Sequence, residues 1–172
     1  MSLVLQSSGG GSVTLQEAVT ASNLTITVPA VTGTMAIQGP AFSAYLGSGQ
    51  NISSATWTKV QLNIEEFDTA SAFDNTTNYR FTPTVAGYYQ ITAALVPTTA
   101  ATQANIAIYK NGIIFKSIQC IGTFTGALVT SLVYLNGSSD YVESYAFLVG
   151  TTPTMSGNLS DTYFQAALIR SA

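Results

Sequence analysis

The sequence lacks histidine altogether and has a single cysteine, Cys120. Without histidine the chain has no side chain that ordinarily titrates near neutral pH, and it lacks the commonest general base and metal ligand. One cysteine cannot form a disulfide within the chain, and no histidine can activate its thiol as a nucleophile. These absences favour a protein that is not an enzyme and uses no cofactor or metal, with Cys120 as a small buried apolar side chain.

Charge is also scarce: charged residues make up 8% of the chain and hydrophobic residues 47%. A typical globular chain has about 25% charged residues, so an isolated copy could not cover its surface in the usual way. We therefore expect other subunits to cover a large share of the surface. The five basic residues are scattered and the net charge is −3, which disfavours nucleic acid and membrane as partners. Long hydrophobic runs are missing too, since stretches such as 127–135 are far below the ~20 residues of a spanning helix.

Helical periodicity is nearly absent, and short β-branched and aromatic runs recur between Gly, Asn, Pro and Ser. The pair Asn111-Gly112 predicts a tight hairpin, and residues 136–140 predict a looser one. The expected strands are 41–46, 56–63, 79–85, 87–96, 104–110, 113–118, 126–135, 140–148 and 162–170. The fold class is therefore all-β, and eight to ten strands in one domain fit a jelly-roll β-sandwich.

Residues 1–39 contain no aromatic side chain, so they lack the large anchors of a core. We expect this region to be an extended β arm for anchoring or assembly, followed from Pro40 by a jelly-roll domain over 40–172. The residues expected to anchor the arm are Val13, Leu15, Leu24, Ile26 and Val28. No basic stretch followed by a long apolar core begins the sequence, so we expect no secretory signal.

One spacing in the expected domain is more specific: Leu62-x5-Asp68-x4-Phe73-x7-Phe81-x5-Gly87-x-Tyr89-x-Ile91-x-Ala93. It resembles the signature of the globular head of complement component 1q, a branch of the tumour necrosis factor superfamily. Phe81, Gly87 and Tyr89 match the centre of that signature. Leu62, Ile91 and Ala93 stand where the signature mostly has aromatic residues, so they match it less closely. The gap before Phe81 is one residue longer than in the signature. The resemblance covers about residues 40–172 and implies a ten-strand jelly roll that assembles as a compact homotrimer.

In the family, one face of the inner sheet enters the sandwich core and the other meets the threefold axis. Alternation along the strands then implies a core of Phe73, Phe81, Gly87, Tyr89, Ile91, Phe164 and Leu168. It implies a trimer interface of Tyr88, Gln90, Thr92, Leu128, Thr130, Leu132, Tyr134, Tyr163, Gln165, Ala167 and Ile169. A slip of one residue would invert the assignment on any of these strands.

The arm resembles segments of tailed-phage structural proteins in its phrases 9–15 and 28–34. This resemblance implies a virion protein, and the leading hypothesis is a trimeric capsid decoration protein whose arms bind the major capsid protein or another virion protein. The alternative is the receptor-binding tip of a tail or head fibre, with a host receptor or glycan as partner. A second alternative is a soluble binding module of the tumour necrosis factor-like superfamily.

Two further groups of residues leave alternatives open. Glu65, Glu66 and Asp68 form the only acid cluster, which we interpret as a solvated loop, with a calcium site as the alternative. Trp57 and Tyr45 could form a sugar-binding platform if they were exposed together, but we favour packing at a subunit seam.

Overall fold

The computed structural model describes residues 2–6, 8–16, 39–99, 101–122 and 126–172. The chain divides into two compact units, Met1–Thr34 and Met35–Ala172, and each is described by itself. In the first unit, β1 (Ser2–Gln6) pairs antiparallel with β2 (Ser12–Gln16). The expected anchors Val13 and Leu15 belong to β2, whereas Leu24, Ile26 and Val28 lie outside the described residues.

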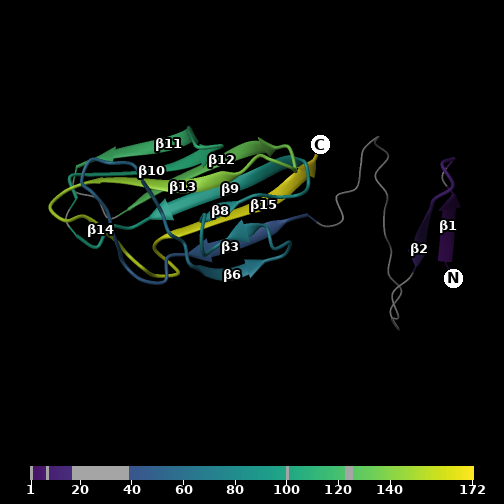
Figure 1. Cartoon of the computed structure of the whole chain (residues 1–172), viewed down its shortest axis with the longest axis horizontal. Coiled ribbons are helices and arrows are strands. Elements are labelled where there is room, and N and C mark those ends of the chain that lie inside the picture. Colours follow the sequence, from purple (N-terminus) through teal and green to yellow (C-terminus); the bar gives the residue numbers. More distant parts are fainter. Residues whose placement is uncertain (1, 7, 17–38, 100, 123–125) are drawn as a thin grey trace. The chain divides into compact units, whose positions relative to one another are not determined.

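The second unit is built on two larger antiparallel sheets and a small one (Figure 1). The five-stranded sheet has the order β12-β9-β15-β3-β6. Its strands are β12 (Ala127–Leu135), β9 (Gly87–Leu95), β15 (Tyr163–Ser171), β3 (Ala41–Tyr45) and β6 (Ile64–Asp68). Strands far apart in the sequence are neighbours here, since β15 pairs with both β9 and β3. Such non-local pairing is typical of a jelly roll rather than of a simple meander.

The second larger sheet is six-stranded, with the order β11-β10-β13-β8-β7 and with β5 also paired to β13. Its strands are β11 (Ile113–Ile121), β10 (Gln103–Lys110), β13 (Val142–Val149), β8 (Arg80–Phe81), β7 (Phe73–Asp74) and β5 (Thr58–Lys59). At one end of the sandwich, β14 (Thr154–Met155) pairs with β4 (Gln50–Asn51) (Figure 1). No helix occurs among the described residues, so none there is long and apolar enough to cross a membrane.

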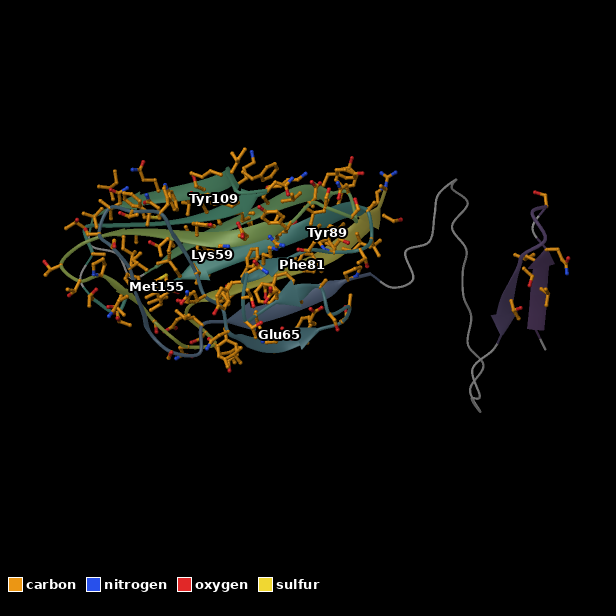
Figure 2. The ribbon with its side chains drawn as sticks, viewed as in Figure 1. Lys59, Glu65, Phe81, Tyr89, Tyr109 and Met155 are labelled. Carbon is orange, nitrogen blue, oxygen red and sulfur yellow. The ribbon has the colours of Figure 1, made fainter. Side chains whose placement is uncertain are left out.

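The core lies between the two larger sheets and is centred on stacked phenylalanines. The Phe42 ring lies 4.6 Å from the rings of both Phe73 and Phe81, and 5.3 Å from that of Phe164. Tyr89 meets Phe81 edge-on at 5.6 Å, and both labelled rings lie inside the sandwich (Figure 2). Of the residues expected in the core, the buried ones are Phe73, Phe81, Gly87, Tyr89, Ile91 and Phe164, and Leu168 is partly buried against them.

Gly87 shows why glycine stands at the centre of the sequence signature. The pairing of β15 with β9 shifts register between Leu168 and Arg170, so a β-bulge forms opposite the start of β9. A Cβ atom at position 87 would overlap the Arg170 carbonyl oxygen and the Leu168 side chain. The bulge therefore brings the two backbones closer than any side chain allows.

Three expectations about strands are wrong in detail. The expected strand 56–63 is reduced to β5, and the expected strand 79–85 is reduced to β8, which ends before Pro83. Proline lacks the N–H that would continue the ladder. The acid cluster lies not in a loop but in β6, at the edge of the five-stranded sheet. Charged residues are common on edge strands because they discourage further pairing.

Candidate assembly interface

The outward face of the five-stranded sheet is where the expected interface residues lie. Along β9, Tyr89, Ile91 and Ala93 are fully buried, so Tyr88 and the alternate residues after it point away from the core. The same alternation holds in β12 and β15. Exposed members of the expected set are Tyr88, Leu128, Thr130, Leu132, Tyr134, Gln165 and Ile169, and half-buried members are Gln90, Thr92, Tyr163 and Ala167.

A row of neutral polar side chains crosses the middle of this face. The strand registers place Thr130 opposite Thr92, Thr92 opposite Gln165, and Gln165 opposite Ser43. The Gln90 amide donates a hydrogen bond to the Thr130 hydroxyl at 2.5 Å, and the Thr130 and Thr92 hydroxyls lie 3.1 Å apart. These side chains thus partly satisfy one another, which lowers the cost of removing the face from water.

Large apolar side chains flank the polar row on both sides. Leu128 and Leu132 are 51% and 57% exposed, and Ile169, the extra residue of the bulge, is 58% exposed. Tyr88 and Tyr134 pair across the strands with their rings 5.5 Å apart. A monomer in water rarely leaves so many large apolar side chains together on one sheet face, so this surface fits a protein–protein contact.

We define a second apolar surface, the edge patch, as the exposed residues of β11. Its members are Ile113, Ile114, Phe115, Ile118 and Ile121, from 39% to 73% exposed. The strand pairs only with β10 among the described strands, so it forms an edge of the six-stranded sheet. Sequence reasoning missed this patch because residues 113–118 are predicted simply as one strand of a hairpin, and the strand extends to Ile121. Consecutive apolar residues in place of alternation are the signal that could have identified it.

The acid cluster of β6 is tied into the local fold. The Ser43 hydroxyl donates to a Glu66 carboxylate oxygen at 2.6 Å, and Asp68 accepts the backbone N–H groups of Ala70 and Phe73. Burial, and then the nearby charge of Asp68, raise the pKa of Glu65. In the part of the chain that the structure describes, no three Asp, Glu, Cys or His side chains come together in a group that could hold a metal ion. Glu66 and Asp68 are thus engaged in hydrogen bonds within the fold.

The remaining candidates are separated in space. Tyr45 lies on the outward face of the five-stranded sheet, opposite Tyr163 and Ile64. Trp57 lies instead against Tyr109 and Phe147 of the six-stranded sheet, so the two residues do not form one platform. Cys120 is only partly buried rather than enclosed, because it lies on the edge strand β11. Its side chain still packs against the core.

Together, the two packed antiparallel sheets, their strand order and the non-local pairing of β15 define a β-sandwich of the jelly-roll type. None of the protein-family models matches the chain, and no curated protein matches it. Solved structures do share the fold. Murine APRIL at pH 5.0 is similar with a TM-score of 0.61 and 6% sequence identity, over 77% of this chain and 100% of that chain.

Murine APRIL at pH 8.0 gives a TM-score of 0.59 at 8% identity, over 77% of this chain and 100% of that one. The Eiger TNF of S. frugiperda gives 0.55 at 8% identity, over 78% of this chain and 94% of that one. Identities this low establish the fold alone. The tumour necrosis factor-like jelly roll expected from the sequence is therefore confirmed, while the relation of residues 1–39 to phage proteins stays a prediction.

Proposed function

We propose that this chain is a non-enzymatic binding module that assembles as a homotrimer through the outward face of its five-stranded sheet. The observation that carries the proposal is the composition of that face. Strands β12, β9 and β3 contain no charged residue, β15 contains only Arg170, and the acids of the sheet are confined to its edge strand β6. A face whose central strands are nearly free of charge and carry several half-exposed large side chains is stabilised when another copy covers it.

The two apolar surfaces support a closed ring rather than a twofold dimer. A twofold contact joins one patch to the same patch, whereas a cyclic ring joins two different patches on each copy. The outward sheet face and the edge patch are different surfaces on different sheets. A ring in which the edge patch of one copy packs on the sheet face of the next would bury both.

A binding role, rather than catalysis, fits the side chains that the sequence offers. The chain has no histidine to act as a general base, and the single cysteine, Cys120, packs against the core. Glu66 and Asp68 of β6 are engaged in hydrogen bonds within the fold, as described above. The assembled trimer would therefore act by presenting surfaces to a partner.

The test is the mass of the assembly in solution. Native mass spectrometry and sedimentation equilibrium of the full chain at micromolar concentration should both give three times the chain mass of 18.0 kDa. A monomer that stays folded across this range, or a stable dimer, would contradict the proposal.

A virion structural role is a second candidate, and the observation that favours it lies in the first unit. The β1–β2 hairpin exposes Val4 and Leu5 by 48% and 53%, and a two-stranded hairpin is marginally stable alone. Such a hairpin gains order by pairing with or packing on a partner. With the phage-like phrases 9–15 and 28–34, this supports anchoring of the trimer on a capsid lattice or on a fibre.

Quantitative mass spectrometry of purified particles tests this second candidate, with the major capsid protein as the internal reference. Hundreds of copies per particle would support capsid decoration, and a handful would support a fibre tip. Deleting residues 1–39 should abolish capsid binding in the first case and leave cell binding intact in the second. Absence of the protein from particles would contradict both versions and leave the free binding module.

A further inference from the structure

The outward face of the six-stranded sheet has an aromatic cluster that the core does not include. Ile106, Ile108 and Ala146 are fully buried, so the residues that alternate with them on β10 and β13 point outward. We define the cluster as Trp57, Tyr109, Tyr145 and Phe147. The Trp57 ring lies 5.4 Å from Phe147 and 6.2 Å from Tyr109, and Tyr109 stacks on Tyr145 at 3.9 Å. All of these rings are partly exposed, so the face offers flat aromatic surface to water.

From the aromatic cluster, residues 57–63 lead across the outside of the sandwich. Val60 and Leu62 are fully buried, whereas the alternate residues Gln61 and Asn63 are exposed. The same alternation puts Lys59 beside Tyr145, with its ammonium 5.8 Å from the ring centre. Trp57, Lys59, Gln61 and Asn63 therefore form one outward strip, about 20 Å long at ~3.3 Å per residue.

The far end of this strip opens into a polar pocket. The pocket has a volume of about 350 Å³, within the range of small-molecule sites, and is lined by Ser48, Gln50, Asn51, Gln61, Asn63, Tyr79 and their neighbours Leu46 and Gly49. Several of its hydrogen-bonding groups are unused. Among the described residues, the side chains of Gln61 and Tyr79 have no hydrogen-bond partner. Asn63 and Asn51 are engaged only through their carbonyl oxygens, which leaves both amide N–H groups free.

The backbone at the pocket is strained at one aromatic residue. Tyr79 has a φ of 49°, in the left-handed region that bulky side chains rarely adopt. Such strain costs of order 1–3 kcal/mol in general and is concentrated at functional sites. Tyr79 follows Asn78, whose carbonyl accepts a hydrogen bond from the Lys59 ammonium at 3.1 Å, so the strip itself holds this residue in place.

The charge of the strip is neutralised within the fold. The Lys59 ammonium (Figure 2) lies 2.6 Å from the carboxylate of Glu143, and Glu143 is 3% exposed. No other residue of the strip or pocket carries a charge. A phosphate or sulfate would find no free cation here, and a carboxylate-binding role is equally disfavoured. The surface instead combines aromatic faces with neutral donors and acceptors.

We propose that the strip from Trp57 to the pocket binds a neutral oligosaccharide. A sugar ring has an apolar face of C–H groups, which stacks on Trp57 and its neighbouring rings. Its hydroxyl groups exchange hydrogen bonds with the free amides of Gln61, Asn63 and Asn51 and with the Tyr79 hydroxyl. The inference rests on the proposed function as a binding module, and it names the ligand class and its place. The strip and its pocket contain no residue of the proposed trimer interface and end beside β6, at the opposite edge of the five-stranded sheet from β12, so a sugar and a neighbouring copy would not compete for the same side chains.

Trp57 is the only tryptophan in the chain, so its fluorescence reports directly on this site. The full chain is first screened on a printed array of neutral, sialylated and sulfated glycans. Emission is then recorded while maltohexaose, cellohexaose, N-acetylchitohexaose and the strongest array binder are added. We expect a neutral glycan to bind and to shift the Trp57 emission to shorter wavelength in a saturable way. Binding restricted to sialylated or sulfated glycans, or no binding to any glycan, would overturn the inference.

Three variants locate the bound sugar by calorimetry. Gln61→Ala removes an exposed amide and should weaken binding about tenfold without changing the thermal midpoint. Tyr79→Asn suits the positive φ, so it should leave the thermal midpoint unchanged or raised while binding is again weakened. Trp57→Leu should abolish binding. Leu159→Ala removes a side chain that is 47% exposed on a loop outside the strip and should bind as the original chain does.

Native mass spectrometry of the same samples separates failure of this inference from failure of the proposed function. Trimers that bind no sugar would overturn only the oligosaccharide site. A monomer that binds no sugar would contradict both. Binding that survives all three strip variants would show that the sugar lies elsewhere and would overturn the assignment.

Discussion

The two larger sheets of the sandwich differ in how charge is distributed along their strands. Every strand of the six-stranded sheet carries one charged residue, namely Lys110, Lys116, Glu143, Lys59, Arg80 and Asp74. In the five-stranded sheet, three of the five strands carry none. Both sheets contribute one face to the same core, so the difference reflects what their outward faces meet. The sheet with a charge on every strand is suited to water, and the charge-free strands β12, β9 and β3 are suited to a protein contact.

The outward faces also differ in how far they satisfy themselves. On the six-stranded sheet, Glu143 is buried with Lys59 as its partner, and Ala107, opposite Tyr145, is fully buried. On the five-stranded sheet, Leu128, Leu132 and Ile169 are each more than half exposed. Around Glu143 the first face is satisfied within one chain, whereas the second leaves large apolar side chains in water. The same kind of substitution should therefore have a different effect on assembly or stability on each of the two outward faces.

The largest expected effect is the loss of assembly on placing a charge on the uncharged face. Leu132→Arg should raise the dissociation constant of the trimer roughly 1000-fold, about 4 kcal/mol, because each copy would bury an unpaired guanidinium. Sedimentation velocity at several concentrations measures the change. The matched control is Gln61→Arg, at an exposed position in the segment between β5 and β6, which should remain trimeric. Equal behaviour of the two variants would remove the distinction between the faces.

A smaller effect is expected within the five-stranded sheet itself. Gly87→Ala should lower the free energy of unfolding by about 3 kcal/mol, because the new Cβ overlaps the Arg170 carbonyl at the bulge. Urea unfolding followed by circular dichroism provides the measurement. Gly49→Ala is the control, because a Cβ there meets its neighbours only at ordinary contact distance. A loss of less than about 1 kcal/mol at position 87 would mean that the bulge can relax.

On the charged sheet, Glu143→Ala should cost about 2 kcal/mol, because Lys59 loses its carboxylate partner 2.6 Å away. The effect is kept modest by the 30% exposure of the Lys59 side chain, which lets water solvate the ammonium. Urea unfolding again measures it. The double variant Lys59→Met, Glu143→Leu should recover most of the loss. If the double variant were as unstable as the single one, packing rather than charge would explain the position.

The smallest effect compares two adjacent tyrosines on opposite faces of β9. Tyr89→Phe should cost about 1 kcal/mol, because the buried hydroxyl donates to the Val85 carbonyl at 2.7 Å. Tyr88→Phe, on the exposed side, should change the stability of the folded subunit by less than about 0.5 kcal/mol. Equilibrium unfolding of both variants at one protein concentration tests the difference.

The stability of the fold at alkaline pH gives a second measure of the burial of Tyr89. Burial raises the pKa of Tyr89 to about 12, above the value of about 10 in an unfolded chain. The stability that the neutral Tyr89 side chain contributes to the fold is therefore fully present below pH 10 and is lost as the pH rises toward 12. Burial also raises the pKa of Tyr109 and Tyr145, so Tyr89→Phe should reduce this alkaline loss without abolishing it. If stability fell with rising pH in the same way in Tyr89→Phe and in the original chain, Tyr89 would not be a source of the alkaline loss.

The fold could be predicted where local pattern and long-range packing agree. Alternation in β9, in β12 and in β15 before its bulge predicts which side chains point inward, because one face of each strand meets the core. The acid strand β6 was missed because its charges suit an edge, which sequence pattern cannot distinguish from a loop. The position of Trp57 could not be predicted either. Residues 57–63 pair through only two positions, and the partners of Trp57 lie about 50 and 90 residues further along the chain.

Strand β15 is the last strand along the chain, yet it lies at the centre of the five-stranded sheet, between β9 and β3. Until it is in place, β3 and β9 have no common neighbour, and the Phe42 stack lacks Phe164. Closing this gap joins segments more than a hundred residues apart, which is a slow step in folding. During synthesis the ribosome must therefore release nearly the whole domain before the sandwich can close. The uncharged strands remain exposed in that interval, so chaperone demand and sensitivity to truncation should both be greatest at this end of the chain.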